Sequence, residues 1–320
     1  MNQPVRFGIL GCARIARRGV IRGIQTASMA QLGAIASRQP ATARAWADEF
    51  QIPAAYGSYE ALLADRNIDA VYIPLPNELH RHWTLRAAEA GKHVLCEKPL
   101  ALDAGDAQAM VDGCRQYGVL LMEAFMWRHH PRVGLVRQML AAGELGELRL
   151  VKMDFSFQID LADWRLDPAR GGGALYDLGC YGINAARLFA GGEPEAIHTQ
   201  AHLHSSGVDL TLAMQLDFGG EITAQLDCSF ECPYRNRLEL VGTRAAVELP
   251  GGVLPPATPQ MIVRQGAEAE LRSVPEGDQY REQVEVFCRS IAAGRLIEPA
   301  EDGLANMRVL DAVRRLAWKR

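Results

Sequence analysis

Short apolar runs alternate with amphipathic stretches between residues 7 and 123, and this alternation constrains the fold more than any other feature of the chain. It is typical of repeated β–α–β units, in which parallel strands are covered by helices on both faces. We expect strands at residues 7–10, 32–36, 70–73, 93–96 and 119–123, with helices at 15–27, 42–50, 59–64, 80–90 and 103–117. The first part of the chain should therefore form a doubly wound α/β domain.

After a further helix at 131–142, the rhythm changes to runs in which apolar and polar residues alternate, at 148–158, 209–218, 221–230 and 237–242. A period of two, interrupted by short glycine-containing turns, indicates strands of an antiparallel sheet. Helices are expected at 174–189, 280–293 and 300–318. We therefore divide the chain into a parallel-sheet domain at 1–126 and an α+β domain with an open, mainly antiparallel sheet at 127–320.

Length and composition agree with two globular domains that have substantial cores. The chain has 320 residues, more than the roughly 100–200 of an ordinary domain, and 48% of them are hydrophobic while 22% are charged. The net charge is −4 and the basic residues are scattered, which argues against binding to nucleic acid or to an anionic membrane surface. Because no apolar stretch suits a signal peptide or a membrane span, we expect a cytoplasmic protein.

The cysteine and histidine residues do not form a pattern typical of a metal site. The seven cysteines are dispersed and odd in number, so we expect reduced thiols rather than a disulfide framework. Cys228 and Cys232 form an isolated pair, and His198, His202 and His204 would share one face of a strand as a polar stripe. We therefore expect no bound metal.

The turn after the first expected strand reads G-I-L-G-C-A-R-I-A and carries small residues of the kind that a dinucleotide-binding turn requires. Gly11 permits the tight turn, Ala13 lets the backbone approach a pyrophosphate, and Ala16 permits close packing of a helix whose N-terminus faces the anion. These features suggest a Rossmann domain. Because two of the three usual glycines are absent, an ordinary strand-to-helix turn remains an alternative.

The second expected strand ends in Ala36, Ser37 and Arg38 rather than in an acidic residue. An Asp or Glu at this point would accept hydrogen bonds from the ribose 2′-hydroxyl of NAD. A hydroxyl followed by a guanidinium instead suits the 2′-phosphate of NADP, because Arg can donate two parallel bonds to phosphate. The alternative is an exposed loop arginine without a ligand.

Further reactive side chains follow other elements. The segment P-L-P-N-E-L-H, residues 74–80, follows the third expected strand, and Glu97, Lys98 and Pro99 follow the fourth. Ligands of open α/β sheets bind at this carboxyl edge, so Lys98 is placed to reach a cofactor, although it could equally be a solvated lysine. Farther on, G-G-G-A-L-Y-D-L-G-C-Y-G enters a helix on which Asp177 and Tyr181 face the same side.

Together, these segments resemble the glucose-fructose oxidoreductase and inositol dehydrogenase family, also written Gfo/Idh/MocA. The resemblance covers nearly the whole chain, through the Gly11 turn, P-L-P-N-E-L-H, E-K-P-L, E-A-F-M-W-R-H-H-P, W-R-L-D-P, D-L-G-C-Y-G and Q-Y-R-E-Q-V-E-V-F. The block at 123–131 and the tyrosine at 181 are most similar to the branch that contains D-xylose dehydrogenase, dimeric dihydrodiol dehydrogenase and glucose-fructose oxidoreductase.

The resemblance implies roles for individual residues. The implied catalytic residues are Lys98, Asp177 and Tyr181, with Tyr181 as the acid or base. The residues expected at the cofactor are Gly11, Cys12, Ala13, Ile15, Ala16, Ser37, Arg38, Leu75, Asn77, His80, Glu97, Lys98, Trp164, Arg165 and Tyr280. Those expected at the substrate are Trp127, Arg128, Trp164, Arg165 and Tyr181. The resemblance also implies a homodimer formed through the open face of the second sheet.

The expected reaction is hydride transfer between NADP, with NAD as the alternative cofactor, and a sugar or sugar-like alcohol or carbonyl compound, such as an aldose oxidised to its lactone. Tyr181 would take the carbinol proton, and the ammonium group of Lys98 would favour the phenolate. A trans-dihydrodiol or sugar-dicarbonyl oxidoreductase would need the same residues. A non-catalytic NADP-sensing regulator is an alternative of another class, against which the joint presence of Lys98, Asp177 and Tyr181 argues.

Overall fold

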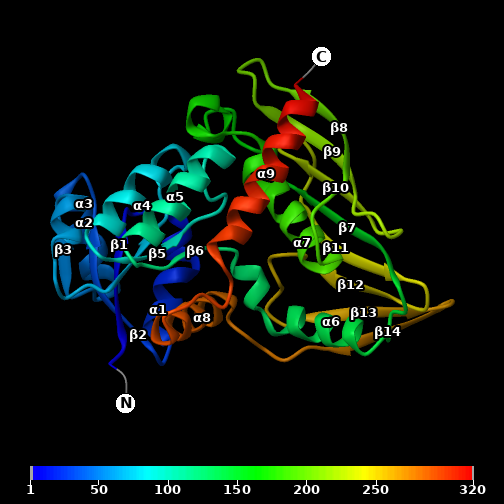
Figure 1. Cartoon of the computed structure of the whole chain (residues 1–320), viewed down its shortest axis with the longest axis horizontal. Helices are drawn as coiled ribbons and strands as arrows, with labels where there is room; N and C mark the ends of the chain where they lie inside the picture. Colours follow the sequence, from blue (N-terminus) through cyan, green and yellow to red (C-terminus); the bar gives the residue numbers. More distant parts are fainter. Residues whose placement is uncertain (1–2, 319–320) are drawn as a thin grey trace. The chain divides into compact units, whose positions relative to one another are not determined.

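The computed structural model describes residues 3–318. The chain forms two compact units, one comprising Met1–His129 and Asp278–Leu304, the other His130–Gly277 and Ala305–Arg320. Each unit contains one of the two sheets, most of whose strands are labelled in Figure 1.

The first unit contains a six-stranded parallel sheet in the order β3-β2-β1-β4-β5-β6. Its strands are β1 (Val5–Leu10), β2 (Ala30–Ala36), β3 (Ala54–Tyr56), β4 (Ala70–Ile73), β5 (His93–Cys96) and β6 (Leu121–Glu123). Every residue of β4 is buried, as expected of a strand that is covered on both faces. The predicted fold class is confirmed, whereas β3 is a strand that the sequence analysis did not identify.

Helices follow the strands of the first sheet in the predicted alternation. They are α1 (Ile21–Thr26), α2 (Pro40–Phe50), α3 (Tyr59–Leu63), α4 (His80–Glu89), α5 (Ala104–Gln116) and, near the end of the chain, α8 (Gln279–Ala293). The helix expected at 15–27 begins with a π-helical turn, Ala16–Val20, before α1. Single π-helical turns of this kind are frequent at functional sites.

Helix α8 belongs to the first unit although it follows the second sheet in the sequence. Phe287 joins the core of that unit, with its ring centroid 6.2 Å from that of Phe7. A Cβ atom on Gly23 of α1 would lie 2.9 Å from the backbone of Tyr280, so α1 and α8 are in close contact. A single division at residue 126 would have put α8 in the second domain, whereas the structure puts it in the first unit. Apolar packing, rather than sequence order, decides where such a helix lies.

The second unit contains an eight-stranded sheet in the order β14-β13-β12-β11-β7-β10-β9-β8. Its strands are β7 (Leu148–Ser156), β8 (Ala196–Leu203), β9 (Asp209–Asp217), β10 (Thr223–Ser229), β11 (Arg235–Gly242), β12 (Ala246–Pro250), β13 (Gln260–Gln265) and β14 (Glu268–Ser273). Neighbouring strands are antiparallel except β7 and β10, which pair in parallel. The sheet is therefore mixed but mainly antiparallel, as predicted.

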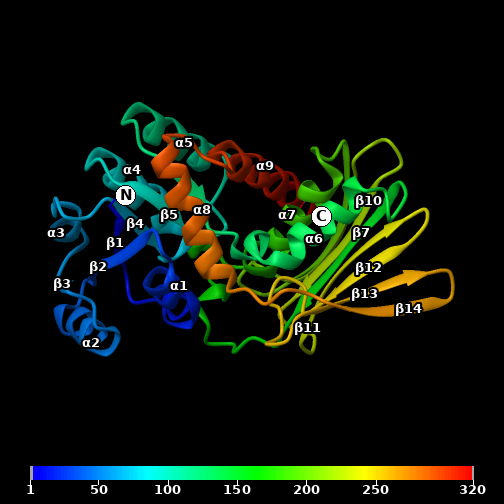
Figure 2. The same cartoon turned by 90° about the horizontal axis from the view of Figure 1, so that it is seen from below.

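Three longer helices accompany this sheet: α6 (Pro131–Ala141), α7 (Cys180–Ala190) and α9 (Ala300–Ala317). Helix α7, which packs on β7, is preceded by a second π-helical turn, Leu175–Gly179 (Figure 2). Helix α9 begins in the first unit and continues in the second. No helix within residues 3–318 is both long enough and apolar enough to cross a membrane.

The two faces of the second sheet differ in polarity. On β7, Met153 and Phe155 are buried, whereas Lys152 and Asp154 point to the opposite face, as the pleat requires. There Lys152 pairs with Glu239 at 3.8 Å, and Arg237 pairs with Asp154 on the same strand pair at 3.1 Å. The sheet thus presents an apolar face to the helices and a face with cross-strand ion pairs on the other side.

Candidate active site

The turn after β1 requires glycine at position 11, because of its backbone conformation and the nearby Leu75 side chain. Gly11 has φ +113°, a backbone conformation that favours glycine, and a Cβ atom there would lie 2.8 Å from Leu75. Its N–H donates to the carbonyl oxygen of Ala36 at 2.9 Å, and the Ala16 N–H donates to Ala13 at 3.0 Å. Ala16 is buried, while three other expected cofactor residues are half-buried along the turn: Cys12, Ala13 and Ile15.

Ser37 lies beside this turn, immediately after β2. Its N–H donates to the carbonyl oxygen of Tyr56 at 3.1 Å, which fixes the position of the loop. The Cys12 thiol is hydrogen bonded with Ser37, although burial still raises the pKa of Cys12 to about 11. The thiol is therefore neutral near pH 7 and unsuited to act as a nucleophile.

Arg38 meets a tyrosine that the sequence analysis missed. Tyr59 opens α3, is 5% exposed, and its hydroxyl lies 3.6 Å from the position that a Cβ atom on Gly11 would take. Burial raises the pKa of the Tyr59 phenol, and the charge of Arg38, which is hydrogen bonded with it, opposes that shift. The end of β2, α3 and the glycine turn thus meet around one guanidinium.

His80 connects two loops at the carboxyl edge of the sheet. The ring is fully buried, with Nε2 2.7 Å from the carbonyl oxygen of Leu75 and Nδ1 3.0 Å from that of Pro99 and 3.3 Å from that of Leu100. Both ring nitrogens therefore face backbone carbonyls. His80 therefore holds the Leu75 loop to the Lys98–Pro99 loop, and the cofactor contact expected of it stays a prediction. Asn77 lies in a short 3-10 turn just before it and is also buried.

Glu97 and Lys98 follow β5, and Glu97 is anchored in the core. The Tyr72 hydroxyl donates to Glu97 Oε1 at 2.5 Å, and the Lys98 N–H lies 3.3 Å from Glu97 Oε2. The ring of Tyr280, from α8, packs directly against Gly19. A Cβ atom on Gly19 would lie 2.3 Å from that ring, so the glycine makes room for the tyrosine. Burial raises the pKa of Tyr280 to about 12, with Glu97 raising it further and Lys98 opposing. Tyr280 is therefore close to both the π-helical turn and the Lys98 loop.

In the second unit, an ion-pair network surrounds the start of the helix that carries Tyr181. Arg165 Nε lies 2.9 Å from Asp177 Oδ2, and Arg165 Nη1 lies 3.0 Å from Asp163 Oδ2. Tyr181 is 6% exposed, and its ring centroid is 6.0 Å from that of Phe155 on β7. The phenol is thus packed against the sheet while Asp177 is held by an arginine.

Trp164 contacts two arginine side chains near the same network. The guanidinium carbons of Arg165 and Arg170 lie 5.4 and 5.0 Å from the centroid of its indole ring, within the range of cation–π interactions. The structure therefore brings Trp164, Arg165, Asp177 and Tyr181 together within the second unit.

Trp127 and Arg128 lie in the first unit, in the 3-10 turn Met126–His129. Trp127 is 1% exposed and belongs to the core. Arg128 forms ion pairs with Glu298, at 3.4 Å, and with Asp302. Burial and ion pairs within the first unit thus hold both side chains in place. The substrate contact expected of Trp127 and Arg128 stays a prediction.

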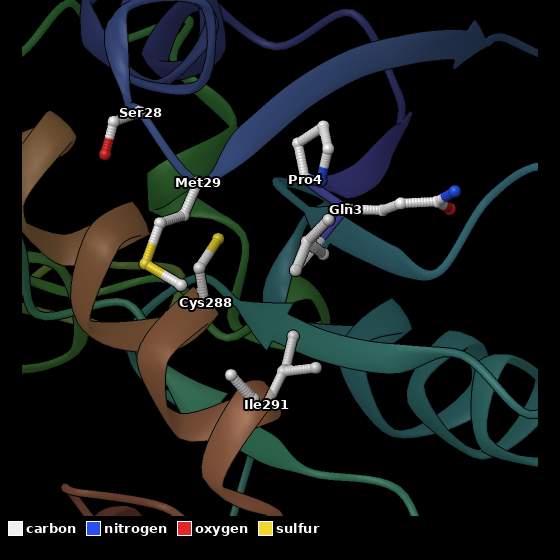
Figure 3. A pocket seen from close by; sticks show the side chains of 8 residues that line it. Gln3, Pro4, Ser28, Met29, Cys288 and Ile291 are labelled. Carbon is white, nitrogen blue, oxygen red and sulfur yellow. The ribbon is translucent and has the colours of Figure 1, made fainter. Parts of the chain in front are cut away.

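A surface hollow of about 290 Å³ lies elsewhere in the first unit (Figure 3). It is lined by Val5 and Met29, at the starts of β1 and β2, and by Cys288 and Ile291 of α8. Gly11 and Ser37 lie at the opposite ends of the same two strands. The hollow is therefore not part of the candidate site.

Two of the three histidines at 198, 202 and 204 have local contacts. His202 Nδ1 lies 2.8 Å from Glu231, and His204 Nδ1 lies 2.9 Å from the Ser206 hydroxyl. Within residues 3–318, no group of three or more His, Cys, Asp or Glu side chains is arranged to hold a metal ion. All seven cysteines are free thiols.

Comparison with known families assigns both halves of the chain. Residues 5–125 match the oxidoreductase family with an NAD-binding Rossmann fold, and residues 133–248 match the GFO/IDH/MocA C-terminal domain. The chain belongs to the GFO/IDH/MocA oxidoreductase family. The resemblance noted in the sequence is thereby confirmed, and the protein is an oxidoreductase.

Members of the family with assigned activities are similar over almost the whole chain. D-xylose 1-dehydrogenase (NADP(+)) 2 of Haloferax volcanii is 41% identical, over 96% of this chain and 95% of the relative. A 3-ketoreductase from Actinomadura kijaniata, solved in complex with NADP and TDP-benzene, has a TM-score of 0.91 and 35% identity, with 98% of both chains covered. Aldose-aldose oxidoreductase from Caulobacter crescentus, complexed with glycerol, has a TM-score of 0.92 and 30% identity, with 98% of both chains covered.

The contacts of His80 generate a stability prediction within this family fold. His80→Leu removes the ring N–H that donates to the backbone carbonyls around it, so the free energy of unfolding should fall by about 2 kcal/mol. His82→Leu is the matched control, because His82 lies on the same helix and is exposed. Urea unfolding of the two variants and the native protein measures the difference. Equal stability of the two variants would contradict the bridging role of His80.

Proposed function

We propose that the protein is an NADP-dependent oxidoreductase that transfers a hydride between the nicotinamide ring and a carbinol or carbonyl carbon of a sugar-like substrate. The observation that carries the proposal is the meeting of the Gly11 turn, Ser37, Arg38 and Tyr59 at the carboxyl edge of the first sheet. Dinucleotides bind open parallel sheets at this edge.

The residues at this edge fit NADP better than NAD. Gly11 gives the turn a backbone conformation that favours glycine, and the helical turn that follows has N–H groups that could donate to an anion. No acidic side chain follows β2, where NAD-binding domains place one for the ribose hydroxyl. Arg38 stands there instead, beside the Tyr59 hydroxyl, and can donate to a 2′-phosphate.

Replacing Arg38 tests the choice of cofactor. A hydrogen bond to a charged group is worth about 1.5–3 kcal/mol, so Arg38→Ala should weaken NADP binding roughly 10- to 100-fold and change NAD binding little. Calorimetric titration with both dinucleotides measures this, with Arg86→Ala in the last turn of α4 as the control. A native preference for NAD, or an equal loss for both cofactors, would exclude the assignment of Arg38 to the 2′-phosphate.

The substrate is proposed from the relatives and from the residues around Tyr181. D-xylose dehydrogenase and aldose-aldose oxidoreductase are named for sugars, and this supports an aldose that is oxidised at its anomeric carbon to a lactone. The 3-ketoreductase was solved with TDP-benzene, and this supports a second candidate, the reduction of a keto group on a nucleotide-linked sugar. Trp164 and Arg165, near the start of the Tyr181 helix, are proposed to contact the substrate.

A substrate screen separates these candidates. Pentoses and hexoses with NADP, trans-dihydrodiols with NADP, and keto sugars with NADPH are followed by the absorbance of the reduced nicotinamide. We expect the highest kcat/KM with an aldose. Turnover of the other classes alone would replace the aldose by the corresponding alternative. NADP binding without turnover of any of these substrate classes would support a non-catalytic NADP-sensing regulator and contradict the proposed reaction.

The mechanism proposed for this chain assigns the proton to Tyr181. When bound, the nicotinamide accepts or supplies the hydride. Tyr181 takes the proton of the substrate hydroxyl during oxidation and returns it during reduction. The ammonium group of Lys98 favours the phenolate and stabilises the negative charge that develops on the substrate oxygen. Asp177, which forms an ion pair with Arg165, places a carboxylate one helical turn before Tyr181.

Tyr181→Phe tests this assignment while keeping the ring and its packing on Phe155. Loss of the transferable proton should lower kcat by roughly 10²- to 10⁴-fold and leave NADP affinity unchanged. Lys98→Met should be similarly impaired, and the two losses should not add, because the groups act together. Native kcat/KM for oxidation should rise with pH through one ionisation that belongs to the coupled pair.

Tyr176→Phe is the matched control, since Tyr176 lies in the same π-helical turn and its hydroxyl accepts a hydrogen bond from Arg314. Its kcat should remain near the native value. Steady-state kinetics over a range of pH measures all these variants. A Tyr181→Phe enzyme with native kcat and the native ionisation would transfer the base role to another residue.

We further propose that the protein is a homodimer that pairs through the face of the second sheet opposite α7. That face carries Lys152, Asp154, Arg237 and Glu239, whose cross-strand ion pairs make it polar. An interface there would be held by complementary charge and should weaken with salt. The cytoplasmic location remains a prediction from the sequence.

A further inference from the structure

A buried carboxylate, Asp209, lies under the glycine-rich turn that leads to Tyr181. Asp209 is the first residue of β9 and is 1% exposed. It accepts a hydrogen bond from the Leu175 N–H at 2.6 Å. Gly173 has φ +116°, and a Cβ atom there would lie 2.1 Å from Asp209 Oδ1. The glycine is therefore required for the turn to close over the carboxylate.

The same turn is fixed from its other side by the segment that carries Trp164 and Arg165. The Gly173 N–H donates to the carbonyl oxygen of Arg165 at 2.9 Å, and a Cβ atom on Gly172 would lie 2.3 Å from that oxygen. The Asp177 N–H in turn donates to the carbonyl oxygen of Gly173 at 3.2 Å. A displacement of Gly173 would therefore reach both Arg165 and Asp177, which pair with each other.

Asp209 satisfies a polar group that would otherwise be unpaired. The first N–H groups of a helix have no partner within it, and Leu175 opens the π-helical turn from which α7 continues. Above about pH 7, where Asp209 is ionised, its negative charge also interacts favourably with the helix dipole. Because this hydrogen bond has a fixed direction, it can set the start of the helix more sharply than apolar packing can.

We propose that Asp209 is a positioning residue, which holds the start of the helix so that Asp177 and Tyr181 point toward the substrate. This inference rests on the proposed function, because it assumes that Tyr181 handles the proton. Asp209 acts through the N–H group of Leu175 and the turn at Gly173.

Asp209→Asn tests the proposal, because asparagine keeps the shape and one carbonyl acceptor but cannot ionise. Small misplacements at a reacting centre are costly, so kcat should fall roughly 10- to 100-fold, with NADP affinity unchanged. Asp209→Ala, which removes the acceptor, should be impaired more than Asp209→Asn. Asp217→Asn, at the exposed end of the same strand, should keep the native kcat.

A double-mutant cycle with Tyr181→Phe decides whether Asp209 acts through the phenol. The loss caused by Asp209→Asn should largely disappear in the Tyr181→Phe background, since an already inactive phenol cannot be misplaced further. A native kcat in Asp209→Asn, or a full loss that persists in the Tyr181→Phe background, would overturn the positioning role. A native kcat in Tyr181→Phe alone would instead refute the proposed base, so the two failures are distinguishable.

Stability against pH provides a readout that does not depend on activity. Burial raises the pKa of Asp209 from 3.8 to about 7, against the opposing effect of the backbone hydrogen bonds. The titratable groups nearby are the thiol of Cys228 on β10, whose pKa is raised by burial and by the charge of Asp209, and Cys180 and Asp227, which also act on Cys228. Between about pH 4 and pH 7 the unfolded chain has lost the Asp209 proton while the folded chain keeps it.

Raising the pH through this window should therefore lower the free energy of unfolding of the native protein relative to that of Asp209→Asn, and the difference should become constant above about pH 7. Urea unfolding at pH 5, 6, 7 and 8 measures it. A pH dependence identical in the two proteins would contradict a buried, titrating carboxylate at this position.

Discussion

Parallel strand pairing fixes where each strand of the first sheet ends, and the proposed dinucleotide site depends on that constraint. Leu10 pairs with Ala36 and Ile73 with Cys96, so the loops after four strands leave the sheet at one edge. The Gly11 N–H extends the first pairing into the turn by donating to Ala36. Side chains from distant parts of the sequence meet there because the sheet presents all its carboxyl ends together.

The sequence was sufficient for features that depend on local periodicity. Apolar runs of four or five residues predicted most of the parallel strands. Alternation with a period of two predicted β7, β9, β10 and β11, because burial on one or two faces leaves a direct pattern in the residues. Features that depend on a distant partner were not predictable in this way. The parallel pairing of β7 with β10 and the packing of Phe287 beside Phe7 are decided by surfaces that only the folded chain brings together.

The same distinction separates the site residues that the sequence indicated from those it missed. Arg38 and Lys98 follow strands directly, so their place at the sheet edge could be inferred from order alone. Tyr59 opens a short helix and Asp209 opens a strand, and neither position carries a local signal of function. Tyr59 contacts Arg38, and Asp209 contacts Leu175. Both contacts join segments that are separated in the sequence, so only the folded chain shows them.

In each unit, directional polar contacts lie where the chain leaves regular structure. Glu97 is held by the Tyr72 hydroxyl, His80 by backbone carbonyls, and Asp209 by the Leu175 N–H, and all three side chains are buried. Burying such groups costs free energy that an apolar core would not require. Apolar packing is non-directional, however, whereas a reacting centre needs side chains held within fractions of an ångström. The buried polar contacts therefore lie next to the loops whose geometry the chemistry requires, and the apolar cores stabilise the sheets from which those loops emerge.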